Sequence, residues 1–123
     1  MILYRPVGLR ELELIAQANF KAFPPRLPEQ PIFYPVLNFE YAKQIARDWN
    51  TKSPPSYAGF VTQFEVEQAY FEKFEVHTVG NCTHQELWIP AEELEEFNQH
   101  IVGMIKVVAA YYGESFAGKR VAL

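Results

Sequence analysis

The sequence predicts an α+β fold, with a small mixed or antiparallel sheet of roughly five or six strands and about three helices. Apolar and polar residues alternate over residues 59–66, as expected for a strand with one buried face. Apolar residues recur at helical spacing over residues 9–20 and 39–50, as in amphipathic helices. With 123 residues, of which 49% are hydrophobic, the chain can form one core. We expect a single α+β domain over residues 1–112 and a loosely ordered tail over residues 113–123.

The N-terminal part begins with a short strand and a helix. Residues 2–7 are mostly apolar and predict a strand, which Pro6 shortens because a proline nitrogen has no hydrogen for the ladder. Gly8 separates this strand from the helix expected over residues 9–20. Four prolines among residues 23–31 then predict an irregular loop, partly in the polyproline II conformation.

A strand expected over residues 33–37 leads directly into the helix over residues 39–50. Asn38 lies between them and is a natural N-cap, because its side-chain oxygen can accept a hydrogen bond from a backbone N–H of the first turn. This junction fixes where the last side chains of the strand point. The buried face of the helix is expected to comprise Tyr41, Ala42, Ile45, Ala46 and Trp49.

The C-terminal half predicts short strands with a further helix between them. Short strands are expected over residues 76–79 and 86–89. Pro90 is suited to the first position of the next helix. The buried face of that helix is expected to comprise Leu94, Phe97 and Ile101. Gly103 is expected to end the helix, and the last strand to cover residues 104–112.

Charge and composition argue against several classes of partner. The net charge is -4 and the basic residues are scattered, so we expect binding neither to nucleic acid nor to an anionic membrane surface. No run approaches ~20 apolar residues, so we expect neither a signal peptide nor a membrane span. The one cysteine, Cys82, cannot form an internal disulfide, which is typical of a cytoplasmic protein.

Metal binding and nucleophilic hydrolysis are not predicted. The histidines His77, His84 and His100 lack the close helical pairing of zinc proteases, and Cys82 has no C-x-x-C partner. Cys82 and His84 are close in sequence, but a free cysteine is more often a small core residue than a metal ligand. Neither G-x-S-x-G nor G-x-G-x-x-G occurs. We therefore expect no metal cofactor.

Three residues are candidates for a binding site. Arg5 lies in an otherwise apolar strand, where a charged side chain costs free energy unless it is paired or faces a cleft. Its guanidinium suits a phosphate or carboxylate ligand, but an internal salt bridge with Glu11, Glu65 or Glu86 explains it equally well. Glu86 is either a solvent-facing strand residue or the acid of a site. Tyr34 is either a ring that stacks on a planar ligand or an amphipathic core residue.

The segments that contain these candidates resemble three motifs of the ADP-ribosyltransferase-like fold. Residues 3–5 (LYR) resemble its first core strand, and residues 33–38 (FYPVLN) with the following helix resemble its second motif. Residues 85–90 (QELWIP) resemble the strand that bears the catalytic glutamate. Nearly the whole chain also resembles short bacterial proteins labelled "ADP-ribosylation/crystallin J1", through the segments YRPVG, YPVLN, ARDWN, GFVT and ELWIPAEELEEFN.

This resemblance implies a role for each of four residues. Arg5 would hold a phosphate or the ribose of NAD, and Tyr34 would stack on the nicotinamide ring. Glu86 would orient a ribose hydroxyl and stabilise the positive charge that develops on the sugar when nicotinamide leaves. Thr62 is the nearest counterpart of the Ser-Thr-Ser motif of that fold. His84 stands where the family has the first residue of its Q/E-x-E motif.

Two functions remain open from the sequence. In the first, the domain binds NAD or ADP-ribose and performs ADP-ribosyl transfer or a related reaction, with NAD as the substrate. In the second, it is a non-enzymatic interaction module of the same architecture, able to form a homodimer, because a 15% aromatic content suits an interface. A crystallin J1-type hydrolase is not expected, because that fold is all-helical and binds magnesium with clustered aspartates, whereas Asp48 is the only aspartate here. Only the first function requires Arg5, Tyr34 and Glu86 to meet at one open cavity.

Overall fold

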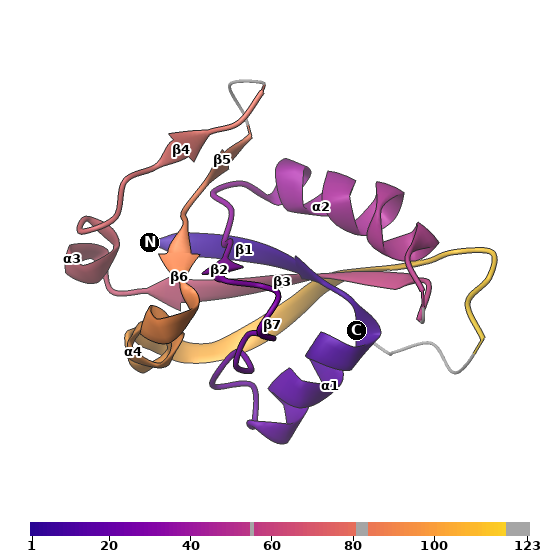
Figure 1. Ribbon diagram of the computed structural model, residues 1–123, viewed down its shortest axis with the longest axis horizontal. Coiled ribbons are helices and arrows are strands. Elements are labelled where there is room, and N and C mark those ends of the chain that lie inside the picture. Colours follow the sequence, from indigo (N-terminus) through magenta and orange to yellow (C-terminus); the bar gives the residue numbers. More distant parts are fainter. Residues whose placement is uncertain (55, 81–83, 118–123) are drawn as a thin grey trace.

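A three-stranded antiparallel sheet forms the centre of the protein (Figure 1). The computed structural model describes residues 1–54, 56–80 and 84–117. In spatial order, the sheet comprises β1 (Ile2–Val7), β3 (Ala58–Val66) and β7 (Ile101–Tyr112). The described residues form four α-helices and seven strands in total, so the α+β class is confirmed. The strand count exceeds the expected one because the strand expected over residues 86–89 is two separate strands, β5 (Gln85–Glu86) and β6 (Ile89–Pro90), which pair with different partners.

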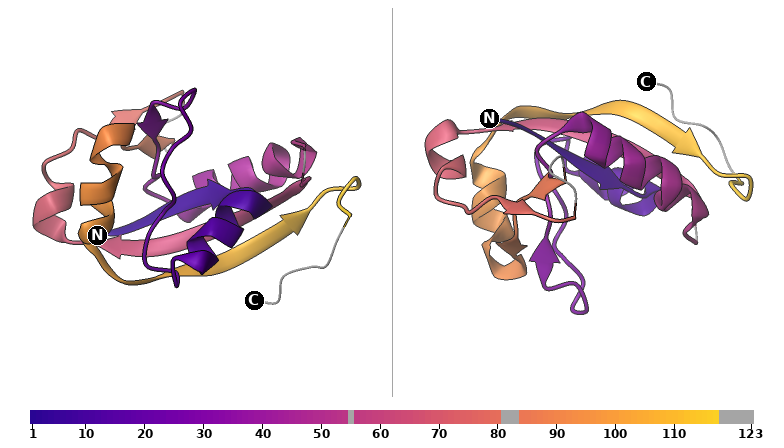
Figure 2. Two further views of the ribbon diagram at one scale, coloured as in Figure 1. Left: turned by 60° about the horizontal axis from the view of Figure 1, so that its bottom comes forward. Right: turned by 90° about the horizontal axis from the view of Figure 1, so that it is seen from above.

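Helices cover both faces of this sheet. α1 (Leu9–Gln17) packs on the face that carries Phe60, and α2 (Phe39–Asp48) packs on the face that carries Val61. Consecutive strand residues point to opposite faces, so the two helices lie on opposite sides of the sheet, as Figures 1 and 2 show. The helical side chains buried in these contacts are Leu12 and Ile15 from α1, and Ala42 and Ala46 from α2.

Two short ladders extend the structure beyond β1. They pair β2 (Ile32–Phe33) with β6 (Ile89–Pro90), and β4 (His77–Thr78) with β5 (Gln85–Glu86). Val36 forms an antiparallel bridge to Tyr4 on one side and to Glu86 on the other. The segment around Val36 therefore lies between β1 and β5. Because neighbouring strands are about 5 Å apart, this arrangement brings Glu86 within about 10 Å of the backbone of β1.

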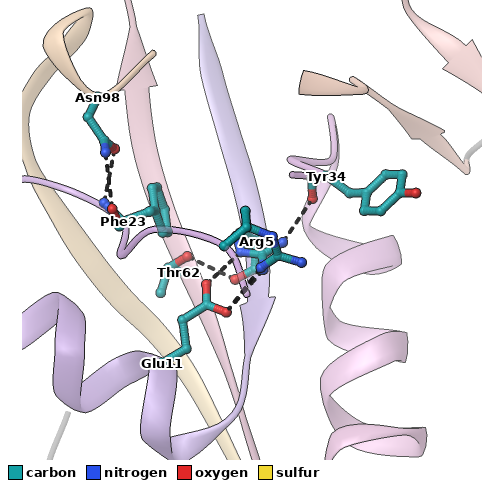
Figure 3. A network of polar contacts seen from close by, with 7 residues as sticks. Arg5, Glu11, Phe23, Tyr34, Thr62 and Asn98 are labelled. Carbon is teal, nitrogen blue, oxygen red and sulfur yellow. Dashed lines mark hydrogen bonds and ion pairs between the residues drawn. The ribbon is translucent and has the colours of Figure 1, made fainter. Parts of the chain in front are cut away.

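The core on the α1 face is rich in phenylalanine. Its largest fully buried side chains are Phe33, Phe60, Phe64 and Phe97. The ring of Phe23, from the proline-rich loop, lies 4.8 Å from the ring of Phe64. The Phe23 backbone exchanges two hydrogen bonds with the Asn98 side chain, at 2.9 and 3.0 Å (Figure 3). The loop is thus anchored although it contains no regular element. The remaining helices are η1 (Asn50–Lys52), α3 (Gln68–Phe71), η2 (Ala91–Glu93) and α4 (Leu94–Gln99).

The N-cap at Asn38 is confirmed, but the strand expected before it over residues 33–37 is limited to β2 and the isolated bridges of Val36. The prediction that Trp49 is buried is wrong. The Asn38 side chain accepts a hydrogen bond of 2.8 Å from the Tyr41 backbone N–H, as an N-cap does. Trp49 is 69% exposed. The helix ends at Asp48, so Trp49 lies past its last turn and does not continue the buried face.

Further boundaries differ from the sequence-based expectation. Pro90, expected as the first residue of a helix, lies in β6 and directly precedes η2. α4 ends at Gln99, and Ile101 belongs to β7, not to the helix. Gly103 has φ +76° and lies inside β7, near a shift in the β3–β7 register, so it marks a bulge and not a helix end. α1 ends before Phe20, because Asn19 and Phe20 both adopt φ 58°, which a right-handed helix cannot accommodate.

The expected tail makes specific contacts where the structure describes it. The Gly113 N–H donates a hydrogen bond of 2.8 Å to the Tyr57 carbonyl. The ring of Phe116 lies 4.6 Å from the ring of Tyr112. Residues 113–117 therefore pack against the end of the sheet, and residues 118–123 lie outside the described part of the chain.

Candidate functional site

Arg5, Tyr34 and Glu86, three of the four predicted site residues, line one cavity. Its volume is about 420 Å³, within the range of about 300–1,000 Å³ that is typical of small-molecule sites. The other lining residues are Pro6, Val36, Ile45, Val79 and Trp88. The cavity is thus mainly apolar, with one guanidinium and one carboxylate in its wall. The Val36 bridges explain the convergence, because they hold β1 and β5 on either side of the segment that carries Tyr34.

The guanidinium of Arg5 is largely committed to the protein itself (Figure 3). Its Nε and Nη2 donate to the two carboxylate oxygens of Glu11, at 2.7 and 3.0 Å. Nη1 makes a weaker contact of 3.4 Å with the Tyr34 carbonyl, and the guanidinium carbon lies 4.6 Å from the centre of the Phe33 ring. Arg5 is only 7% exposed. Of the internal salt bridges considered from the sequence, the one with Glu11 is present.

A second guanidinium approaches the same carboxylate. Arg26 Nη1 lies 3.8 Å from Glu11 Oε1, and the Arg26 side chain is 11% exposed. Its Nε is buried without a hydrogen-bond partner among the described residues. Burial, and then the charge of Arg5, lower the pKa of Arg26 from its ordinary value. Two cations therefore share Glu11, and Arg26 holds the proline-rich loop against α1.

Tyr34 contributes to the site in two ways. Its backbone carbonyl points toward Arg5, whereas its side chain points away from Arg5 (Figure 3). The residue is 41% exposed and lines the cavity, so it is not a core residue. A half-exposed ring at the rim of an apolar cavity has the placement that stacking on a planar ligand requires.

Glu86 is held by two neutral donors. The Trp88 indole N–H donates to Oε1 at 2.9 Å, and the Tyr41 hydroxyl donates to Oε2 at 3.2 Å. Burial, followed by the negative charge of Glu86 and then by this hydrogen bond, raises the pKa of Tyr41. The carboxylate is therefore fixed in position without an ion pair to another described residue.

Two histidines extend this group at either end. The ring of His77 stacks on Trp88 at 3.7 Å with an interplanar angle of 3°, and the ring of His84 stacks on Tyr41 at 4.3 Å and 9°. His77 is the antiparallel partner of Glu86 in the β4–β5 ladder. These stacks restrict the rings of Trp88 and Tyr41, and so restrict the two donors to Glu86.

Thr62, the fourth predicted site residue, lies elsewhere. It is fully buried in β3, and its hydroxyl donates a hydrogen bond of 2.8 Å to the Arg5 carbonyl. Its side chain is not part of the cavity wall. Thr62 thus supports the strand that carries Arg5. Because it is buried outside the cavity wall, its side chain is not placed to contact a ligand there.

No metal centre is formed by the described residues. They contain no group of three or more His, Cys, Asp or Glu side chains placed to hold an ion. The suggested pairing of Cys82 with His84 lies partly outside the described residues, because Cys82 is not among them. The helices of the described chain are also too short or too polar for any of them to cross a membrane.

Sequence reasoning missed Tyr41, Trp88 and His77 as parts of the site. Trp88 was detectable, because it follows Glu86 by two residues, and such residues share one face of an extended segment. Tyr41 was assigned only to the buried face of a helix. His77 carried no signal of its own, because its place depends on the β4–β5 register.

Comparison of the chain with protein-family models, with curated proteins and with solved structures found no match. The functional assignment therefore depends on the geometry of the cavity and on the motif resemblance.

Proposed function

We propose that this protein binds NAD or ADP-ribose in the cavity and transfers ADP-ribose from NAD to an acceptor. The observation that supports this proposal is the meeting of Arg5, Tyr34 and Glu86, which are distant in sequence, at one cavity of about 420 Å³. A cavity of this size accommodates one ring system with its sugar, so the rest of a dinucleotide extends outside it. The proposal places the protein in the cytoplasm, in agreement with its single cysteine.

Each cavity residue has a part in this proposal. Tyr34 stacks on the nicotinamide ring from the rim. Arg5 uses three of its guanidinium N–H groups within the protein, which leaves two of about five for a ligand oxygen. Glu86 faces the ribose carbon at which the bond breaks.

The chemistry at Glu86 follows from charge. The bond between the ribose carbon and the nicotinamide nitrogen breaks, and its electron pair stays with nicotinamide. The sugar is left with positive charge, which a fixed carboxylate stabilises more in the transition state than in the ground state. The acceptor nucleophile then forms the new bond to the same carbon and loses its proton. Tyr41 and Trp88 hold the carboxylate in place for this step.

A thermal-shift titration with NAD and ADP-ribose tests the binding. A specific ligand stabilises the folded state by about 2.7 kcal/mol at about 100 times its Kd, so the melting temperature rises. Glu86→Ala should weaken the effect of NAD, whereas Glu92→Ala, which removes an exposed carboxylate of η2, should not. Nicotinamide release measures the transfer, and Glu86→Gln should slow it by about 100-fold. No shift with either compound would reject the proposal.

A second candidate function is an interaction module that pairs with a second copy of itself. The observation that favours it is a row of register partners on the open part of the sheet, Ile2–Glu65–Val102. Ile2 and Val102 are 40% and 46% exposed. Met104, which is 52% exposed, and Lys106 line the same shallow hollow.

The charges of this hollow fit a second copy. Glu65 and Lys106 both lie in it, and neither forms an ion pair with another described residue. A patch with one charge of each sign is complementary to itself under a two-fold axis. Sedimentation velocity tests this: Met104→Glu should give monomers, whereas Leu27→Glu, at a 55% exposed position of the proline-rich loop, should not change the state. A wild-type protein that is monomeric at all concentrations would reject it.

A further inference from the structure

The two charged residues in the cavity wall are not equivalent. The charge of Arg5 is balanced at 2.7 Å by Glu11, and only 7% of the residue is exposed. Glu86 instead accepts hydrogen bonds from Tyr41 and Trp88, which are neutral. No arginine, lysine or histidine of the described chain forms an ion pair with Glu86. Glu86 is therefore the cavity residue whose charge lacks a counter-charge.

The aromatic residues of the cavity favour a positively charged ligand, as the charge of Glu86 does. Tyr34 and Trp88 are 41% and 46% exposed, and both line the cavity. The face of an aromatic ring is electronegative and attracts cations, by about 0.5–2 kcal/mol for each well-placed ring. The stacking of His77 on Trp88 and the bond of the indole to Glu86 fix this ring in place. A bound cation would thus meet a ring at Trp88 and a carboxylate at Glu86 that need no rearrangement.

The positive charges of Arg5 and Arg26, the cationic cluster beside the cavity, do not cancel this preference for a cation. Arg5 and Arg26 share Glu11, so the cluster carries one excess positive charge. Arg26, however, is not one of the residues that line the cavity. The other lining residues besides Arg5, Glu86 and the two aromatic residues are uncharged and apolar: Pro6, Val36, Ile45 and Val79. Arg5 is only 7% exposed, whereas Tyr34 and Trp88 are 41% and 46% exposed, so a ligand ring in the cavity has more aromatic than guanidinium surface to contact.

From these contacts we infer that the cavity selects a planar organic cation over a neutral ring of the same shape. The charged ring stacks between Tyr34 and Trp88, with its positive charge beside the Glu86 carboxylate. For the dinucleotide, this selection rests on the proposed function. Oxidised NAD, with its charged pyridinium ring, should then bind, and NADH, with its neutral dihydropyridine ring, should be rejected. The charge preference itself depends only on the residues of the cavity.

Calorimetric titration with two pairs of ligands tests this inference. The first pair is 1-methylnicotinamide, a cation, and nicotinamide, its neutral analogue, and the second pair is NAD and NADH. The wild-type protein should bind the cation of each pair at least about 10-fold more tightly, which corresponds to about 1.4 kcal/mol. Glu86→Gln, which keeps the shape and loses the charge, should reduce this ratio toward one. Glu92→Gln makes the same change at an exposed position outside the cavity and should leave the ratio unchanged.

The outcomes separate this inference from the proposed function. Equal affinity for the cationic and neutral members of both pairs, or an undiminished preference for the cation in Glu86→Gln, overturns the charge selection. If NAD and ADP-ribose bind without discrimination against NADH, the proposed function stands and the inference fails. If 1-methylnicotinamide binds through Glu86 but neither NAD nor ADP-ribose binds, the inference stands and the proposed function fails. Absence of binding by all these compounds overturns both.

Discussion

Glu11, in the first turn of α1, accepts two hydrogen bonds from the guanidinium of Arg5 in β1, at 2.7 and 3.0 Å. Both oxygens of the carboxylate are used, in the bidentate geometry that is the strongest form of this pair. The pair joins the first helix to the first strand across Gly8, and through Arg5 it also reaches the Tyr34 carbonyl. A charged residue in an apolar strand is thereby satisfied by a residue six positions away in the chain.

Replacement of Arg5 by methionine should destabilise the fold. The side chains of Arg5 and Glu11 are 9% and 21% exposed, so the change leaves a mostly buried carboxylate with a weaker partner, Arg26 at 3.8 Å. Loss of one partner of a buried pair costs about 3–5 kcal/mol, and we expect the lower end because Arg26 remains. Urea denaturation measures the change.

The double variant Arg5→Met/Glu11→Leu serves as the control for this experiment. Because it removes both charges, it should recover part of the lost stability, and the double-mutant cycle should show coupling between the two sites. A single variant with less than about 1 kcal/mol of destabilisation would contradict a structural role for this pair.

The hydroxyl of Tyr41 should titrate above the ordinary tyrosine value of about 10. Burial raises its pKa first, and the charge of Glu86 raises it further. A raised pKa in the folded state means that the protonated phenol stabilises the fold below pH about 10, and that this contribution is lost as the pH rises through the folded-state pKa. The absorbance difference at high pH between wild type and Tyr41→Phe gives this titration.

Glu86→Gln tests how far the charge of Glu86 raises the pKa of Tyr41. The amide removes the charge beside Tyr41 but leaves the hydroxyl buried. The midpoint of the Tyr41 titration should therefore fall, yet its pKa should stay above the ordinary tyrosine value. An unchanged midpoint in Glu86→Gln would show that the hydrogen bond between Tyr41 and Glu86 is not formed in solution.

Asn38→Ala should destabilise the protein by about 1 kcal/mol, because the side chain that accepts from the Tyr41 backbone N–H is removed. Asn38→Ser retains a capping oxygen and should retain most of the stability. Thermal melting followed by circular dichroism distinguishes the two. Equal melting temperatures for Ala and Ser would contradict the capping role.

Local signals predicted the elements that depend on neighbouring residues. The strand over residues 2–7, the Asn38 cap and the alternating strand within residues 58–66 follow from spacing and side-chain chemistry alone, and the structure contains them. The candidates Arg5, Tyr34 and Glu86 could be selected because each is polar in an apolar segment. Their convergence depends on the two bridges of Val36, which no local pattern specifies.

The unpredicted features depend on long-range contacts. Beyond the end of α1 at Gln17, the Phe20 carbonyl accepts a hydrogen bond of 2.7 Å from the Ile105 N–H of β7. This contact fixes Phe20 with φ 58° and occupies a backbone group on the outer edge of β7. It therefore interrupts the edge that another strand would use. Asn19, also with φ 58°, follows the last helical turn, and together with this long-range contact it directs the chain away from the helix, which helical periodicity alone does not show.

Gly59→Ala should be strongly destabilising, because β3 passes close to the end of α2 at this position. A Cβ at Gly59 would clash with the Ala46 carbonyl oxygen and lie 2.7 Å from the Cβ of Asn50. Both obstacles are near the backbone, so the helix itself must shift, and overpacking of this kind costs about 1–3 kcal/mol or more. Gly8→Ala is the matched control, since the nearest atom to its added Cβ is Ser56 Oγ at 3.9 Å. Urea denaturation should show a much larger loss at Gly59 than at Gly8, and equal losses would mean that α2 does not pack on β3 as described.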